Sequence, residues 1–479
     1  MSDIFSNTDK EKIMSTNVIN KKDASVQTNG KIIPYTPVSI KPSEVHQTLS
    51  RHMLADGFDM VIDIKKSHGA RIYDSRYGKK YLDFFSFFAS SALGMNHPKL
   101  NSPEFREKLS YVAVNKVSNS DVFSVEMAEF VETFYRLAQP EYLPYVFFID
   151  GGALANENAM KTAFDWKVRK NFAKGYTAER GHQVIHFRHA FHGRSGYTMS
   201  LTNTDPVKTN YFPKFKWPRI HNPAIKFPLN EQNLKQVIEE ENLALRQIKE
   251  AIINNPDDIA AMIIEPIQAE GGDNHFRKEF FQELRTICDE NEILLIFDEV
   301  QCGVGLTGKL WAHEYFVKPD LLSFGKKTHV CGFMSSTRVD DILENVFNKE
   351  SRLNSTFGGN LVDMVRFKRI LEVIQEENLV ENARVQGEYL LNQLQSLARE
   401  FPQLVLNPRG RGLMCAFDCD TAQNRNQLIS KAYEEGLILI GCGDRTIRFR
   451  PPLIIVGDEL AEGLQIIRNA LKELSVGEL

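Results

Sequence analysis

Two apolar runs in the middle of the chain each end at a side chain that can do chemistry. The run Ile293-Leu294-Leu295-Ile296-Phe297 ends at Asp298, and the run Leu321-Leu322-Ser323-Phe324 is followed by Lys326 and Lys327. Short apolar runs of this kind are typical of buried strands. Pyridoxal phosphate requires an amine that forms a Schiff base with its aldehyde and a carboxylate that keeps its ring nitrogen protonated. The two strand ends therefore predict a site for this cofactor, although a structural aspartate at a strand end remains the alternative.

A glycine turn offers a second part of such a site. Gly151, Gly152 and Ala153 follow the strand predicted at Val146–Ile149 and open a helix. The first N–H groups of a helix are free, and the helix dipole is positive at that end, so a phosphate can bind there. An ordinary tight turn between a strand and a helix is the alternative interpretation.

Two loops carry further candidates. Phe191 and Arg194 follow the strand predicted at Val184–Phe187, and Glu270 lies in the loop after Glu265 and Pro266. An aromatic ring can stack on a planar cofactor, and an arginine can bind a carboxylate through two hydrogen bonds. A glutamate in an active-site loop can neutralise a substrate-binding arginine when the substrate brings only one carboxylate. Each residue alone is also compatible with a structural or surface role.

Short apolar runs alternate with helical stretches in the middle of the chain, which predicts an α/β fold with a mostly parallel sheet. The predicted strands of this sheet are Val146–Ile149, Val184–Phe187, Ala261–Ile264, Ile293–Phe297 and Leu321–Phe324. An N-terminal meander with strands at Met60–Ile62, Arg71–Tyr73 and Tyr81–Phe84 precedes it. The sheet is followed by a long helical stretch over Val362–Glu400, by strands at Leu413–Phe417, Leu437–Ile440 and Thr446–Arg450, and by a final helix from about Asp458.

This pattern predicts a division into domains. We expect residues 1–37 to be a flexible polar tail and residues 38–98 to join a smaller α+β domain. Residues 99–353 form the large cofactor-binding domain, and residues 354–479 form the C-terminal part of the small domain. The tail has acidic residues and no arginine, unlike a transit peptide.

Composition and charge exclude several classes of function. The net charge of −4 gives no electrostatic reason to expect nucleic acid as a partner. No apolar run approaches the roughly 18 to 20 residues of a membrane span. The six cysteines form no Cys-x-x-Cys pair, so we expect no metal site, and reduced thiols favour the cytoplasm.

The glycines at 303–308 form a pattern that resembles two nucleotide-binding motifs. Gly303-Val304-Gly305-Leu306-Thr307-Gly308-Lys309 matches G-x-G-x-x-G and the first seven positions of a P-loop. The next residue is Leu310, where a P-loop needs Ser or Thr for magnesium, and a dinucleotide fingerprint belongs near the beginning of its domain. Both matches are thus incomplete. A nucleotide-binding or regulatory protein that uses this glycine loop is kept as the rival hypothesis from another class of function.

Taken together, the motifs resemble the class III aminotransferases among the fold type I pyridoxal phosphate enzymes. The resemblance covers about Val38 to Val476. It rests on the glycine turn and the Phe191 loop, and on three further stretches: Phe324-Gly325-Lys326-Lys327-Thr328, Arg352-Leu353-Asn354-Ser355-Thr356 and Arg409-Gly410-Arg411-Gly412-Leu413-Met414-Cys415-Ala416-Phe417. Cys331 departs from the pattern, since many members have a glycine there. The family's fold implies a large domain with a mostly parallel seven-stranded sheet and a smaller α+β domain.

The resemblance also implies roles for individual residues. Lys327, rather than Lys326, is the lysine that binds the cofactor, because it lies five residues before Gly332. The remaining implied roles are phosphate binding by Gly152 and Ala153, ring stacking by Phe191, contacts of Asp298 and Gln301 with the ring, and a phosphate contact of Thr356 in the neighbouring subunit of a homodimer.

For the substrates, the resemblance implies transfer of the ε-amino group of L-lysine to 2-oxoglutarate. Arg448 would bind the α-carboxylate of 2-oxoglutarate, and Arg194 the distal carboxylate of the substrate. Glu270 would pair with Arg448 while lysine is bound and release it for 2-oxoglutarate. Ornithine and 4-aminobutyrate remain alternative amino donors, because the chemistry is the same and only the pocket differs.

Overall fold

The computed structural model describes residues 37–476, and the predicted tail lies almost entirely outside this range. The described chain separates into two compact units. The first contains residues up to Ser67 together with Ile72–Tyr81, and the second contains His68–Arg71 and all residues from Leu82 onward.

The first unit contains two short helices, η1 (Pro42–Glu44) and α2 (Val45–Ser50), and most of strands β1 (Arg71–Asp74) and β2 (Lys79–Asp83). Asp74 is buried, and its side chain accepts hydrogen bonds from the N–H groups of Val61 (3.0 Å) and Arg76 (2.9 Å). The strand predicted at Met60–Ile62 is wrong, because Ile62 forms only an isolated bridge with Asp74. The N–H of Val61 thus donates to the carboxylate of Asp74 and not to a backbone carbonyl of a neighbouring strand.

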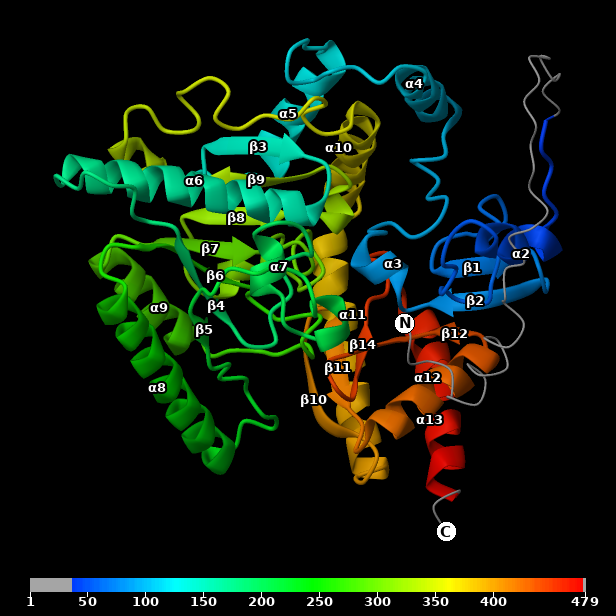
Figure 1. Cartoon of the computed structure of the whole chain (residues 1–479). Coiled ribbons are helices and arrows are strands. Elements are labelled where there is room, and N and C mark those ends of the chain that lie inside the picture. Colours follow the sequence, from blue (N-terminus) through cyan, green and yellow to red (C-terminus); the bar gives the residue numbers. More distant parts are fainter. Residues whose placement is uncertain (1–36, 477–479) are drawn as a thin grey trace, which may run out of the picture. The chain divides into compact units, whose positions relative to one another are not determined.

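A seven-stranded sheet forms the centre of the second unit, and Figure 1 shows its strands in order from β3 at the top to β5 below. The strands in this order are β3 (Tyr145–Ile149), β9 (Cys331–Ser335), β8 (Leu321–Phe324), β7 (Leu294–Asp298), β6 (Ile259–Ile264), β4 (Gln183–Phe187) and β5 (Arg219–Ile220). All neighbouring strands from β8 to β5 are parallel, and β9 runs antiparallel to both of its neighbours. The predicted α/β fold with a mostly parallel seven-stranded sheet is confirmed.

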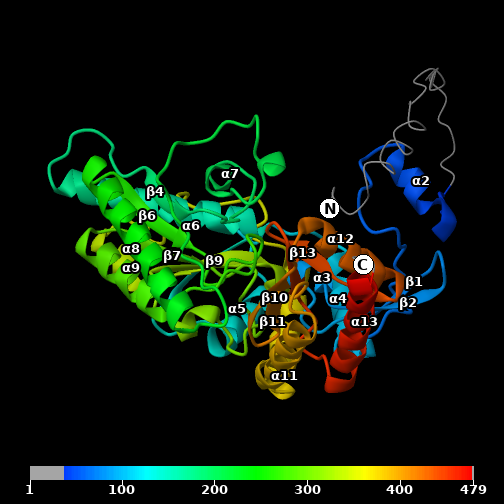
Figure 2. The ribbon, with the colours of Figure 1, turned by 90° about the horizontal axis from the view of Figure 1, so that it is seen from below.

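Helices cover both faces of this sheet because its strands are apolar on both sides. In β6, Ala261 and Ile263 pack in the same cluster as the helix α6 (Gly152–Ala173), whereas Met262 and Ile264 pack against α9 (Lys278–Glu290). Figures 1 and 2 show α9 side by side with α8 (Glu231–Asn254). Continuous burial along β6 is what a parallel strand between two helical layers requires.

The C-terminal part contains a four-stranded antiparallel sheet in the order β10 (Leu406–Arg411), β11 (Met414–Asp418), β14 (Thr446–Phe449) and β13 (Ile440–Cys442). The helical stretch predicted over Val362–Glu400 consists of two helices, α10 (Leu361–Glu376) and α11 (Leu379–Glu400). Asn378, which lies between them, has a left-handed backbone with φ 51°. Helices α12 (Ala422–Glu434) and α13 (Gly457–Val476) complete this part.

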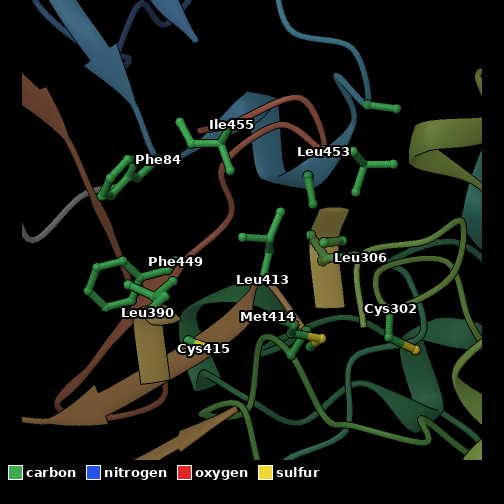
Figure 3. Packing of buried hydrophobic residues seen from close by; sticks show 14 of the residues in the cluster. Phe84, Cys302, Leu306, Leu390, Leu413, Met414, Cys415, Phe449, Leu453 and Ile455 are labelled. Carbon is green, nitrogen blue, oxygen red and sulfur yellow. The ribbon is translucent and has the colours of Figure 1, made fainter. Parts of the chain in front are cut away.

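A large apolar cluster connects these elements, as Figure 3 shows for some of its members. Leu390 of α11, Met414 of β11 and Phe449 of β14 share it with Leu306, which belongs to the glycine-containing loop after β7. Phe84, just after β2, also packs there. The C-terminal sheet is thus packed against the segment that follows Asp298.

The remaining elements are not strands of these two sheets. They are α3 (Ser86–Ala89), α4 (Pro103–Ala113), α5 (Val125–Leu137), α7 (Thr198–Leu201), η2 (Pro206–Lys208), η3 (Ala312–Tyr315), η4 (Lys326–Thr328), η5 (Thr337–Asp341) and β12 (Leu437–Ile438). None of the helices in residues 37–476 has both the length and the apolar composition of a membrane span.

Candidate active site

The acid and the amine predicted from the sequence emerge at the same edge of the seven-stranded sheet. Strands β7 and β8 are parallel, and Asp298 at the end of β7 is in register with Ser323 of β8. Lys327 lies in η4, which begins two residues after β8 ends. The carboxyl edge of an open parallel sheet is where ligands bind in such folds.

Lys327 is buried, with 2% of its surface exposed. Its Nζ donates a hydrogen bond to the backbone carbonyl oxygen of Gln301 at 2.9 Å. Burial lowers the pKa of this amine from 10.5 to about 7. A large fraction of the amine is therefore neutral at pH 7, which is the form that attacks an aldehyde.

Lys326 is also shielded from water, and burial together with the charge of Arg448 lowers its pKa to about 8. Its Nζ lies 5.5 Å from the centre of the Phe88 ring. The two adjacent lysines thus have different surroundings, since Lys327 contacts the segment that follows Asp298 and Lys326 faces an aromatic ring.

Asp298 accepts hydrogen bonds at both carboxylate oxygens. Oδ2 lies 2.7 Å from Asn156 Nδ2 and 2.8 Å from His192 Nδ1, and Oδ1 accepts from the N–H of Val300 at 3.0 Å. Three donors therefore hold this buried carboxylate in place. The Nε2 atom of His192 is buried and has no hydrogen-bond partner among the described residues.

Sequence reasoning missed Asn156 and His192 as partners of Asp298. His192 was visible only as the neighbour of Phe191, and Asn156 as a residue of the helix after the glycine turn. No local pattern indicates that both side chains reach Asp298, because the contact depends on how α6 and the Phe191 loop pack against β7.

The beginning of α6 has the geometry expected of an anion site. Gly151, the residue before the helix, has φ 98° and no side chain, so it provides no side-chain cap for the first N–H groups. A Cβ added at Gly151 would meet nothing within 4 Å, which shows open space beside this helix end. The first N–H groups of α6, including those of Gly152 and Ala153, have no acceptor within the helix and are available to a phosphate.

The start of α6 packs closely against the segments that follow β7 and β8. A Cβ on Gly152 would lie 2.8 Å from Val300 Cγ1, and a Cβ on Gly325 would lie 3.2 Å from the same atom. On the other side, a Cβ on Gly193 would lie 2.5 Å from the Cβ of Ala153. The glycine turn, the end of β7, the end of β8 and the Phe191 loop therefore meet at one place.

Glu265 fixes the loop that carries Phe191. Its Oε1 accepts from the N–H of Phe191 at 3.0 Å, and its Oε2 accepts from the N–H of Ala269 at 3.1 Å. Burial, and then the nearby charge of Asp298, raise the pKa of Glu265 well above its usual value. Its place at the end of a predicted strand gave only a weak signal, because a lone glutamate in a loop is usually solvated.

Arg448 and Glu270 form an ion pair beside Lys327. Arg448 Nη2 lies 2.8 Å from Glu270 Oε2, and Arg448 Nη1 lies 3.5 Å from Gln301 Oε1. Gln301 thus contacts Lys327 through its backbone and Arg448 through its side chain. Burial would raise the pKa of Glu270, but Arg448 and Lys208 together lower it to about 2. The pair is therefore ionised at neutral pH.

Residues of the phenylalanine-rich stretch 84–88 lie partly in the apolar core and partly next to Arg448. Phe84 is fully buried in the apolar cluster, whereas the ring of Phe88 lies 5.7 Å from the Arg448 guanidinium carbon. Ser86 to Ala89 form a left-handed turn with φ between 45° and 65°. Strained backbone of this kind concentrates at functional sites.

The structure does not connect the other two predicted residues to this cluster. Arg194 is exposed, and no hydrogen bond or ion pair of its guanidinium is found within residues 37–476. Thr356 is also exposed, and its carbonyl oxygen accepts from Ser118 Oγ at 2.6 Å. The roles predicted for Arg194 and Thr356 therefore stay predictions.

The glycine-containing loop at 303–308 is filled by its own chain. It forms turns and opens no helix. Added Cβ atoms would lie 2.7 Å from the Trp311 ring at Gly303, 3.1 Å from Leu453 at Gly305 and 3.0 Å from Arg384 at Gly308. The loop has neither the helix end nor the free space of a phosphate cradle, so the nucleotide-binding interpretation is wrong.

The residues at the sheet edge fit pyridoxal phosphate. They provide the buried amine of Lys327 with its lowered pKa and the hydrogen-bonded carboxylate of Asp298. They also provide the buried Nε2 atom of His192, which has no partner among the described residues, and the uncapped start of α6 for the phosphate. A mostly parallel seven-stranded sheet with this site at its carboxyl edge defines the fold type I transferases that use pyridoxal phosphate.

Comparison with known proteins identifies the family. Residues 53–471 match the class III aminotransferases, and the chain belongs to this family, whose cofactor is pyridoxal phosphate. A relative named L-lysine-epsilon aminotransferase from Mycobacterium tuberculosis is 53% identical over 90% of this chain and 96% of its own length. A 4-aminobutyrate aminotransferase from Emericella nidulans is 32% identical over 87% of this chain and 86% of its own.

A solved structure has the same fold. The lysine aminotransferase from M. tuberculosis in the internal aldimine form superimposes with a TM-score of 0.89 at 52% identity, covering 90% of this chain and 99% of that one. The predictions of the family, the fold and the cofactor are confirmed.

Proposed function

We propose that this enzyme transfers the ε-amino group of L-lysine to 2-oxoglutarate, forming 2-aminoadipate 6-semialdehyde and L-glutamate. The observation that carries the proposal is the identity of 53% over 90% of the chain with a relative named L-lysine-epsilon aminotransferase. The geometry of Lys327, Gln301, Arg448 and Glu270 supports it, because it provides a base near an arginine whose charge is compensated by a glutamate.

Bound pyridoxal phosphate supplies an aldehyde that takes up the amino group and a ring that withdraws electrons from the reacting carbon. Gly152 and Ala153 offer the N–H groups at the start of α6 to its phosphate. Asp298 provides the negative charge that keeps a ring nitrogen protonated, and Phe191 provides an aromatic face beside the ring. Gln301 provides a further contact with the ring.

Lys327 acts as the base of the reaction. With a pKa of about 7 its amine can accept a proton from the substrate carbon and donate it at the next step, and catalysis of this kind is most efficient when the pKa lies near the working pH. The hydrogen bond from Nζ to the carbonyl oxygen of Gln301 holds the amine at the sheet edge.

The position next to the reacting carbon must be neutral for lysine and positively charged for 2-oxoglutarate. The ε-carbon of lysine carries no carboxylate, so Glu270 neutralises Arg448 as the structure shows it. The reacting carbon of 2-oxoglutarate carries a carboxylate, which binds Arg448 after Glu270 has moved away. Arg194 binds the carboxylate at the far end of either substrate.

The proposal includes an assembly and a location. In a homodimer, Thr356 reaches the phosphate of the neighbouring subunit's cofactor, and the exposure of Thr356 is compatible with this role. All six cysteines are buried and free, which suits the reducing conditions of the cytoplasm. The division into residues 38–98, 99–353 and 354–479 also belongs to the proposal, and the packing of Phe84 with the C-terminal sheet supports it.

Initial rates with L-lysine, L-ornithine and 4-aminobutyrate, each with 2-oxoglutarate, test the amino donor. We expect L-lysine to give the highest kcat/KM. A higher kcat/KM for ornithine or 4-aminobutyrate would overturn the assignment of the donor and leave the family unchanged.

Glu270→Ala tests the charge compensation. The uncompensated Arg448 should lower kcat/KM for lysine and leave kcat/KM for glutamate the same or higher. An unchanged ratio of the two values would show that the Glu270–Arg448 pair does not distinguish the substrates.

A further inference from the structure

Glu270 has a second cationic partner that the reaction scheme does not use. Lys208 Nζ lies 2.6 Å from Glu270 Oε1, while Arg448 Nη2 lies 2.8 Å from Oε2. Each carboxylate oxygen therefore has its own cation. Lys208 Nζ also lies 3.5 Å from Thr204 Oγ1 and 5.8 Å from the centre of the Phe191 ring.

Lys208 is held in place by a short structured segment. It ends η2, whose first residue is Pro206, and the side chain of Asp205 accepts a hydrogen bond from the N–H of Val207 at 3.0 Å. The Lys208 side chain is 23% exposed and that of Glu270 is 21% exposed, whereas that of Arg448 is only 2% exposed. The lysine thus reaches Glu270 from the solvent side, and the arginine reaches it from the interior.

The backbones on either side of the ion pair are fixed. The carbonyl oxygen of Glu270 accepts from the N–H of Gly443 at 2.9 Å, and Arg448 is paired with Ala416 and Ile440 on both sides of β14. Separation of Glu270 from Arg448 must therefore occur through side-chain rotation. After rotation the carboxylate needs another partner, because it remains largely shielded from water.

We propose that Lys208 is a positioning residue that keeps hold of Glu270 when Arg448 binds the substrate's carboxylate. In the paired state Glu270 contacts both cations, and in the released state Lys208 alone compensates it. Lys208 thereby lowers the free-energy cost of releasing Arg448 and favours dicarboxylate substrates over lysine. This inference rests on the proposed use of one site by two substrates, and it adds the residue that makes the exchange possible.

The test compares Lys208→Met, which removes the charge and keeps an unbranched chain, with Lys208→Arg, which keeps the charge. Lys214→Met is the matched control, because Lys214 lies in the same loop and its Nζ contacts the carbonyl oxygen of Thr209. The first measurement is the dissociation constant of glutarate for the holoenzyme by calorimetry. Glutarate has two carboxylates and no oxo group, so binding is measured without reaction.

The second measurement is the rate of each half-reaction in single turnovers, with L-lysine and with 2-oxoglutarate separately. Lys208→Met should weaken glutarate binding and raise the half-saturating concentration of 2-oxoglutarate about threefold to fivefold, since loss of a partly exposed ion pair has a moderate cost. The half-reaction with lysine should change by less than about twofold, because Arg448 still compensates Glu270. Lys208→Arg and Lys214→Met should resemble the wild type.

Equal effects of Lys208→Met on lysine and 2-oxoglutarate, or no effect on glutarate binding, would overturn the proposal. A failure of the wild type to use lysine would overturn the proposed function instead. In that case the glutarate dissociation constants still decide the role of Lys208, because they do not depend on turnover. If Lys208→Met does not fold, Lys208→Gln takes its place with the same expected results.

Discussion

At the scale of single residues, burial makes the amine of Lys327 chemically competent. Lys327 is buried at the sheet edge, and its lowered pKa of about 7 follows mainly from loss of hydration. The position of an acid and an amine at one sheet edge was predictable from the sequence, because an ionisable side chain at the end of an apolar strand has few structural reasons to be there. The choice of Lys327 over Lys326 came from the resemblance to the family. Glu265, His192, Asn156 and Lys208 were not, because their contacts depend on packing between loops distant in sequence.

The pKa of Lys327 predicts how cofactor binding depends on pH. Attack on the aldehyde requires the neutral amine, and the neutral fraction rises as the pH passes the pKa from below. The rate at which the cofactor-free protein takes up pyridoxal phosphate should therefore increase up to about pH 7 and then level off. Stopped-flow absorbance measures this rate.

A lysine peptide is the control for this experiment, because its amine has the ordinary pKa of 10.5. Its rate should keep rising above about pH 9. If the protein showed the same continued rise, the reacting amine would have an ordinary pKa and burial would not activate Lys327.

At the scale of secondary-structure elements, the apolar runs located the central strands well. The predicted strand Leu321–Phe324 has the bounds of β8, and the other four predicted strands of the sheet differ from those observed by one or two residues. Strand β9 was not predicted, because it lies directly after the lysine loop. Strand β10 was not predicted either, because its sequence contains Pro408, two arginines and Gly410. The run Leu437–Ile440 was taken for one strand, whereas it divides between β12 and β13.

Gly152 has too little space for a side chain, since a Cβ there would lie 2.8 Å from Val300 Cγ1. Gly152→Ala should therefore displace the start of α6 and weaken pyridoxal phosphate binding by about tenfold or more, because overpacking costs about 1–3 kcal/mol. Equilibrium titration of the cofactor-free protein measures the effect. Gly57→Ala is the control, since nothing lies within 4 Å of its Cβ position. Equal affinities of the two variants would contradict the close contact.

Asn378 separates α10 from α11 through its left-handed backbone, with φ 51°. Asn378→Val should lower the free energy of unfolding by about 1–2 kcal/mol, because a β-branched residue is strained in this conformation. Asn378→Gly should leave it nearly unchanged, because glycine adopts positive φ readily. Urea denaturation compares the two variants. A loss with glycine as large as that with valine would mean that the asparagine side chain, not the backbone, ends the first helix.

At the scale of the whole molecule, a buried charge network connects the Glu270 loop with the C-terminal sheet. Asp273 and Arg450 are each about 1% exposed and form an ion pair, with Arg450 Nη1 2.9 Å from Asp273 Oδ2. Arg409 of β10 donates to the carbonyl oxygens of Gly272 (2.6 Å) and Asp273 (3.0 Å). The loop that carries Glu270 is thus attached to the strands that carry Arg448. The alternation of strands and helices predicted the sheet, but no sequence pattern indicates this attachment.

Removal of one partner from this network should destabilise the protein strongly. Asp273→Ala leaves Arg450 buried without its carboxylate, which should lower the free energy of unfolding by about 3–5 kcal/mol. Chemical denaturation measures the change. Glu132→Ala is the control, because its ion pair with Arg136 is exposed on both sides and should contribute little. Similar losses in both variants would show that the Asp273–Arg450 pair is not a specific anchor.

We propose that Lys327, and not Lys326, binds the cofactor covalently. Borohydride reduction of the purified enzyme, followed by proteolysis and fragmentation of the labelled peptide by mass spectrometry, locates the attached pyridoxyl group directly. We expect the label on Lys327 in the wild type and in Lys326→Ala, and no label in Lys327→Ala. A label on Lys326, or on any lysine that survives in Lys327→Ala, would contradict the account.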